Sequence, residues 1–155
     1  MENRNFWKKA GVYAGFIIGT LLVGGLAGFL IRGSMETYAS LNQPPLAPPG
    51  KAFPIVWGIL YLLMGIGSAR VFLTGKSGRR FALVVYWVQL FFNFCWSLIF
   101  FNARMYLAAF LWLIVLRVLI AMMVYAFWKL DRPAGLLQIP YLLWVGFAGY
   151  LNCAV

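Results

Sequence analysis

The sequence contains no histidine and only three carboxylates, Glu2, Glu36 and Asp131. Its two cysteines, Cys95 and Cys153, both lie inside apolar runs. A zinc or di-iron site needs three or four converging histidine, cysteine or carboxylate ligands, which this chain cannot easily supply. Histidine-dependent nucleophilic catalysis is excluded, and catalysis by paired carboxylates is disfavoured. We therefore expect no metal site and no required cofactor, and any chemistry must come from aromatic rings, amides, hydroxyls, the backbone or a bound ligand.

Charge is also scarce. The 155 residues include 13 basic and 3 acidic residues, hydrophobic residues make up 64% of the chain, and the mean hydropathy is +0.86. So few charges cannot cover the surface of a soluble domain. The composition therefore excludes a soluble globular fold and a disordered chain, and it indicates a membrane protein.

Five apolar runs are each long enough to cross a bilayer, because one spanning helix takes about 20 apolar residues. We predict an all-α integral membrane bundle that forms a single domain over residues 1–155. Only residues 102–104 separate the third run from the fourth, which predicts a tight antiparallel pair. The predicted spans are residues 10–31, 53–73, 81–101, 105–128 and 134–154.

One connection, residues 32–52, is much longer than the others. It contains Pro44, Pro45, Pro48 and Pro49, and proline fixes φ and favours extended geometry in the residue before it. A stiff loop of this length, in a protein with otherwise short loops, predicts a lid over a binding site. The alternative is a rigid spacer.

Basic residues are distributed unevenly between the runs. With five spans, nine of them fall on the side that carries the N-terminus and three fall on the other side. The positive-inside rule then places the N-terminus in the cytoplasm and the loop 32–52 outside. This pattern accounts for the net charge of +10, so no nucleic-acid partner is expected. The nine are Arg4, Lys8, Lys9, Arg70, Lys76, Arg79, Arg80, Lys129 and Arg132, and the three are Arg32, Lys51 and Arg104.

Helical periodicity gathers polar and aromatic side chains on one face of the second, third and fifth spans. A membrane helix turns polar groups towards protein or an internal cavity, because unsatisfied amides in lipid are costly. These faces predict a shared cavity for a flat, apolar, polycyclic ligand that stacks on indole and phenol rings. The alternative is that the amides only hold the helices together. The faces consist of Trp57, Tyr61, Met64 and Ser68; Gln89, Asn93, Trp96, Ser97 and Phe100; and Gln138, Tyr141, Trp144, Ala148 and Asn152.

Three further patterns concern helix packing. Arg117 lies near the middle of the fourth span, where a base is costly, so we expect it to face the interior or a partner. Backbone carbonyls or a ligand carboxylate could satisfy it there. Pro140 is expected to kink the fifth span. The glycines of the first span follow spacings that permit close helix approach, within the chain or between two copies; they are Gly11, Gly15, Gly19, Gly24 and Gly28.

Three ordered blocks of the sequence form a more specific pattern. The first reads Pro-Pro-Leu-Ala-Pro-Pro-Gly over residues 44–50 and continues with Phe-Pro-Ile-Val-Trp over residues 53–57. The second reads Gln-Leu-Phe-Phe-Asn-Phe-Cys-Trp-Ser over residues 89–97, and the third begins Pro-Tyr-Leu-Leu-Trp and covers residues 140–152. Together they resemble the translocator protein family, also called TspO, the peripheral benzodiazepine receptor or tryptophan-rich sensory protein, in its bacterial form.

The resemblance covers about residues 10–155 and implies a five-helix bundle, often dimeric, that binds porphyrins beneath the first loop. We therefore expect a homodimer in the lipid bilayer of a bacterial cell membrane, with protoporphyrin IX or a haem-like tetrapyrrole as its ligand. The ligand-binding positions that the family pattern implies are Tyr38, Pro48, Phe53, Trp57, Tyr61, Asn93, Trp96, Trp144, Phe147 and Ala148.

The residues and the resemblance together predict a membrane receptor for porphyrins and similar flat apolar ligands, acting in porphyrin homeostasis or a stress response. One alternative, which the resemblance implies, is an enzyme that degrades porphyrin with light and oxygen. Its redox-active catalytic residues would be Trp57 and Trp144. The other alternative is a transporter of porphyrin or sterol.

Overall fold

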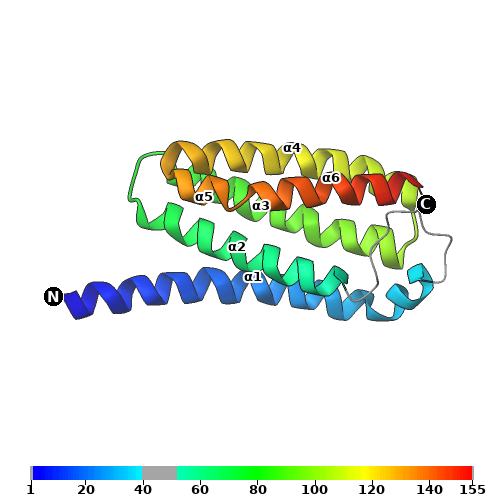
Figure 1. Cartoon of the computed structure of the whole chain (residues 1–155), viewed down its shortest axis with the longest axis horizontal. Helices are drawn as coiled ribbons and strands as arrows, with labels where there is room; N and C mark the ends of the chain where they lie inside the picture. Colours follow the sequence, from blue (N-terminus) through cyan, green and yellow to red (C-terminus); the bar gives the residue numbers. More distant parts are fainter. Residues whose placement is uncertain (1, 40–51, 155) are drawn as a thin grey trace.

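The fold is a bundle of long helices that lie side by side (Figure 1). The computed structural model describes residues 2–39 and 52–154, with side chains for residues 4–34 and 54–153. Within this part of the chain five segments are long and apolar enough to cross a membrane, which confirms the predicted all-α fold. The elements are α1 (Glu2–Ala39), α2 (Ala52–Leu73), α3 (Arg79–Ser97), the π-helix η1 (Leu98–Asn102), α4 (Tyr106–Leu130), α5 (Arg132–Leu136) and α6 (Ile139–Ala154).

The first helix is longer than predicted. It continues through Ala39, so residues 32–39 are helical, although we expected them to begin the long connection. The apolar run ends near Ile31, but residues 32–39 contain no proline and only one glycine, so nothing there stops a helix. The proline-rich segment that follows lies outside the described residues, and its role as a lid stays a prediction.

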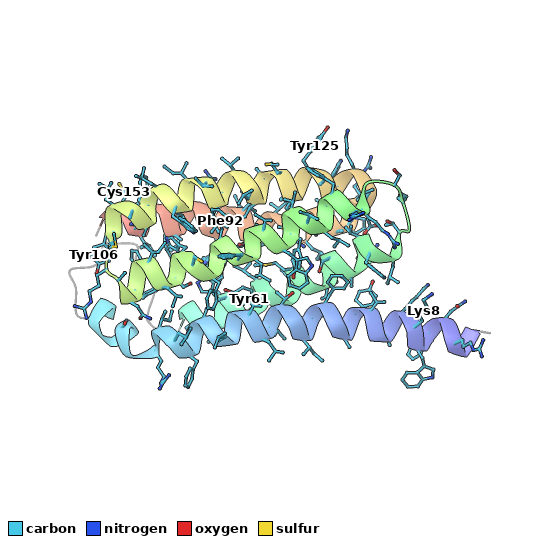
Figure 2. All side chains as sticks on the ribbon, turned by 180° about the vertical axis from the view of Figure 1, so that it is seen from behind. Lys8, Tyr61, Phe92, Tyr106, Tyr125 and Cys153 are labelled. Carbon is cyan, nitrogen blue, oxygen red and sulfur yellow. The ribbon has the colours of Figure 1, made fainter. Side chains whose placement is uncertain are left out.

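The helices form a bundle with α1 at one edge, where it lies along α2 (Figure 1). The predicted antiparallel pair of α3 and α4 is present, and Trp112 Nε1 of α4 donates to the carbonyl of Phe92 on α3 over 2.9 Å. Tyr106 and Cys153 mark one end of the bundle in Figure 2, and Lys8 marks the other. We call these the C-terminal end and the N-terminal end. The least buried span is α1, because it packs mainly against α2.

Glycines allow α1 and α2 to approach closely. A Cβ on Gly65 of α2 would stand 2.7 Å from Cα of Ile17, and a Cβ on Gly24 of α1 would stand 2.3 Å from Cε2 of Tyr61. Both distances are well below the carbon–carbon contact distance of about 3.5–4.0 Å. Gly24 therefore serves packing within the chain. A Cβ on Gly15 would meet no atom within 4 Å, so Gly15 does not serve packing within the chain. Whether such glycines serve homodimerisation stays a prediction.

An ion pair joins the helices at the N-terminal end. Arg70 Nε of α2 donates to Oδ2 of Asp131 over 2.6 Å. Asp131 also accepts from the backbone N–H of Ala134 over 3.2 Å, and it thereby caps α5. The hydrogen bond and the charge of Arg70 hold the pKa of the Asp131 carboxyl below its usual range, against a smaller effect of burial. Lys76 Nζ adds a bond of 2.8 Å to the carbonyl of Leu130 at the end of α4.

Two spans are interrupted. The third ends in the π-helix η1, which the sequence did not predict. The fifth span consists of two helices, α5 and α6, that are separated at residues 137–138. Pro140 lies in the first turn of α6, where its missing N–H is tolerated, and its ring excludes a helical carbonyl four residues earlier, at Leu136. The predicted kink is therefore a full break just before the proline.

Candidate ligand-binding site

The predicted faces of α2, α3 and α6 meet around Trp57. Its ring centroid lies 5.6 Å from that of Tyr61, 6.5 Å from that of Trp96 and 6.4 Å from that of Trp144. Aromatic rings at these separations are in contact. The space left beside them is only about 10 Å³, which is too small for an organic ligand. The aromatic faces therefore form a packed cluster.

A chain of hydrogen bonds runs behind this cluster. The Tyr61 hydroxyl donates to Oδ1 of Asn93 over 2.7 Å, and Nδ2 of Asn93 donates to the hydroxyl oxygen of Tyr141 over 2.8 Å. The Tyr141 hydroxyl then donates to Oε1 of Gln89 over 2.7 Å. All four side chains are buried, so the chain joins α2, α3 and α6 inside the bundle.

The remaining predicted amides also join helices. Trp96 Nε1 donates to Oδ1 of Asn152 over 3.2 Å, and Nδ2 of Asn152 donates to the carbonyl of Tyr106 over 2.8 Å. Gln138 Nε2 reaches the carbonyl of Leu63 on α2 over 3.2 Å. Because most amide atoms have partners inside the protein, this geometry favours the helix-to-helix interpretation of the amides over the cavity interpretation.

An open cavity of about 600 Å³ lies on the other side of Trp57, between α1, α2 and the end of the third span. Small-molecule sites typically have volumes of about 300–1,000 Å³. Within the described residues no group of three or more potential metal ligands exists. The cavity is lined mainly by apolar side chains and glycines, with a few single polar groups. Its lining consists of Leu21, Gly24, Gly25, Ala27, Gly28, Ile31, Arg32, Pro54, Trp57, Gly58, Tyr61, Ser97 and Phe101.

Comparison with known proteins agrees with the predicted resemblance. The sequence profile of the TspO/MBR family matches residues 16–155, which is most of the chain. This chain belongs to the TspO/MBR family. Because the described residues contain five segments that can span a membrane, this family member is an integral membrane protein.

Relatives of this TspO/MBR protein occur in bacteria and animals. Tryptophan-rich protein TspO of Chlorobaculum tepidum is 37% identical over 142 residues, which cover 89% of this chain and 90% of the relative. Tryptophan-rich sensory protein of Cereibacter sphaeroides is 38% identical, with 76% and 73% covered. Translocator protein of Ovis aries is 36% identical, with 87% and 85% covered. The similarity therefore extends over nearly the whole chain in two of the three.

The structure divides the predicted site residues of this TspO/MBR protein between two spaces. Trp57 and Tyr61 line the open cavity. Trp96, Trp144 and Ala148 line the small space inside the aromatic cluster, which Trp57 also borders. Trp57 and Phe101 therefore separate the cavity from the cluster, because both line the two spaces.

The other predicted residues that the structure describes line neither of these two spaces. Phe147 lines an apolar groove of about 470 Å³ between α2 and α6, and Asn93 lies behind Tyr61 in the hydrogen-bonded chain. The side chains of Tyr38 and Phe53 and the whole of Pro48 lie outside the described residues. Their roles in ligand binding stay predictions.

The sequence analysis missed the contribution of α1 to the cavity. Gly24, Ala27 and Gly28 of α1 line the cavity, and so does Phe101 of η1. The glycine spacing was the available signal, because small residues on one helix face either admit a neighbouring helix or leave space unfilled. Here both occur, since Gly24 meets Tyr61 and a Cβ on Gly28 would meet no atom within 4 Å.

Arg117 does not face the interior, so of the two predicted placements only the one towards a partner remains. Its side chain is exposed on the outer surface of α4, where Nη2 lies 3.0 Å from the position of a Cβ on Gly146 of α6. Neither the cavity nor the groove includes it, so it meets no ligand carboxylate there. The inward positions beside it hold the fully buried Leu116 and Ile120, which leave no room for a guanidinium.

Proposed function

We propose that this TspO/MBR protein is a membrane receptor for porphyrins and similar flat apolar ligands, which it binds in the cavity between α1 and α2. The observation that carries the proposal is a volume of about 600 Å³ with Trp57 and Tyr61 in its wall. A flat aromatic ligand gains contact area by stacking on such rings, and the apolar remainder of the wall accepts its hydrocarbon edge.

Arg32 supports a ligand that carries carboxylates. Its Nη1 donates to the carbonyl of Phe29 over 2.6 Å, and its guanidinium carbon lies 3.8 Å from the centre of the Phe29 ring. Arg32 lines the cavity, and these contacts hold its guanidinium against α1. A guanidinium has five N–H donors, so others are left for a carboxylate. A tetrapyrrole with acidic side chains combines the flat apolar body and the anionic edge that this arrangement suits.

The proposal is tested by titrating protoporphyrin IX into the purified protein in detergent, in the dark, and following the quenching of tryptophan fluorescence. Gly28→Leu places a side chain in the open space beside α1, and Gly15→Leu is the matched control because Gly15 also meets open space but does not line the cavity. We expect saturable quenching, weakened on the order of tenfold by Gly28→Leu alone. Quenching that does not saturate, or that Gly28→Leu leaves unchanged, would overturn the proposal.

A second candidate is the degradation of porphyrin with light and oxygen. It is favoured by the position of Trp57, which borders the cavity and contacts Trp144 edge to face at 6.4 Å. A ligand stacked on Trp57 would therefore have two indole rings in line behind it. Illumination in air should produce a new absorbing product, and Trp57→Phe and Trp144→Phe should slow its formation. Trp128→Phe is the control, since Trp128 is exposed and borders neither space. A rate unchanged by the first two substitutions would refute this function.

We also propose that the N-terminal end of the bundle faces the cytoplasm. Nine basic residues belong to that end of the chain's five spans, against three at the other end. Cys153 is exposed at the C-terminal end and offers a direct test. A membrane-impermeant maleimide added to intact cells should label Cys153, and the label should be lost in Cys153→Ser. Labelling only after the cells are opened would mean the reverse orientation.

A further inference from the structure

Arg117 lies deep within the fourth span. It stands 11 positions after Tyr106 and 13 before Leu130, the two ends of α4. At a rise of about 1.5 Å per residue, its Cα is therefore roughly 16–20 Å from either end of the helix. A guanidinium at this depth is costly unless an anion or other acceptor meets it.

The guanidinium lies on the outer seam between α4 and α6. Its Nη2, Cζ and Nε lie 3.0, 3.3 and 3.5 Å from where a Cβ on Gly146 would stand, so the group rests against the α6 backbone at a position that only glycine leaves free. Ile114 and Val118, its neighbours on α4, are 48% and 56% exposed. The charge therefore faces outwards, from an apolar surface.

No described residue meets this charge with a hydrogen bond or an ion pair. The three carboxylates of the chain are also in the wrong places. Asp131 is paired with Arg70 at the N-terminal end, and Glu2 and Glu36 lie outside the spans. A second copy of the chain carries the same carboxylates at the same depths, so a homodimer cannot supply the missing anion.

We propose that Arg117 is the docking point for a transmembrane helix of a different membrane protein, one that carries an aspartate or glutamate at the matching depth. The planar guanidinium fits a carboxylate in a bidentate pair. A helix holds its carboxylate at a fixed depth, whereas the phosphate of a lipid belongs to the interface. Contact with Gly146 keeps the Arg117 guanidinium in the seam between α4 and α6. The exposed side of the guanidinium remains available to the partner helix.

The experiment uses the full-length protein in phosphatidylcholine vesicles, labelled with an energy-transfer acceptor. The probes are donor-labelled leucine-rich single-span peptides that carry glutamate, glutamine or leucine near the middle. We expect the glutamate peptide to associate on the order of tenfold more tightly than the glutamine peptide, as close charge pairs in other interfaces do. The preference should disappear in Arg117→Leu.

The matched control moves the charge without removing it. In the double variant Arg117→Val with Val118→Arg, composition and depth are kept, but the charge turns about 100° around the helix and leaves the seam. The preference should be lost there as well, while Gly15→Leu should keep it. Equal association of the glutamate and glutamine peptides, or a preference that survives Arg117→Leu, would overturn the proposal. Abolition of the preference by added phosphatidylglycerol would also overturn it and would assign the site to a lipid phosphate.

Discussion

Two neighbouring glycines of α1 should respond in opposite directions to the same substitution. In Gly24→Ala the new Cβ would stand 2.3 Å from Cε2 and 2.4 Å from Cδ2 of Tyr61. To restore a contact distance of about 3.5 Å, the ring must move by roughly 1.2 Å. That movement breaks the bond of 2.7 Å between Tyr61 and Asn93, on which the buried chain depends. In Gly25→Ala the Cβ meets nothing within 4 Å.

The expected magnitudes follow from these contacts. Overpacking costs about 1–3 kcal/mol and the lost hydrogen bond about 0.5–1.5 kcal/mol, while alanine gains about 1 kcal/mol over glycine inside a helix. Gly24→Ala should therefore lower the free energy of unfolding by about 2 kcal/mol. Gly25→Ala should raise it by up to about 1 kcal/mol, because only the gain in helix propensity applies.

The assay is unfolding in mixed micelles with rising dodecyl sulfate, followed by tryptophan fluorescence for the wild type and both variants. Near-ultraviolet circular dichroism checks that the aromatic cluster around Trp57 is intact before unfolding. If Gly24→Ala is as stable as Gly25→Ala, then Tyr61 is not held against α1. A tight α1–α2 seam beside the cavity would then be refuted.

Three further outcomes are expected. Because the pKa of Asp131 is lowered in the folded protein, its pair with Arg70 stabilises above the unfolded pKa of about 3.9 and is lost as pH falls through the folded value. Asp131→Asn, which keeps a capping side chain, should cost about 0.5–1 kcal/mol at pH 7 in unfolding titrations, and the cost should shrink as the pH falls below the unfolded pKa. A cost that does not change with pH would contradict this. Gly135→Ala should cost about 1–3 kcal/mol, since its Cβ would stand 2.8 Å from the Trp128 backbone, and an unchanged unfolding midpoint would count against that contact. Asn102→Ala should speed hydrogen exchange at the C-terminal end of α1, because it removes both bonds from Asn102 to that helix.

The sequence predicted the spans well because hydropathy over about 20 residues is a strong signal. Periodicity also predicted which polar side chains face inwards, as the buried Gln89 and Asn93 show. It could not tell whether those amides serve a ligand or a neighbouring helix, because either use requires the same inward face. That choice depends on distances such as those to Tyr61 and Tyr141, which no spacing encodes.

Other features depend on volume or direction. The cavity lies beside α1 because Gly25 and Gly28 are too small to fill the space, and the sequence gives no measure of unfilled space. Arg117 turns outwards because Leu116 and Ile120 already fill the inward positions, whereas depth alone predicts only that the charge is costly. At the end of the π-helix η1, Asn102 is bonded to α1, and such a contact between distant segments is not encoded in local spacing.

The low hydropathy of the last span, which contains α5 and α6, bears on how the protein is made. The last span is the least apolar of the five, so it has the weakest tendency to leave the translocation machinery for lipid unaided. Its two buried amides, Gln138 and Asn152, bond to the carbonyls of Leu63 and Tyr106, which belong to helices synthesised earlier. The acceptors are thus already in the membrane when the last span emerges. Integration of this span during synthesis therefore depends on α2 and α4, and the order of the helices along the chain is also the order in which assembly can proceed.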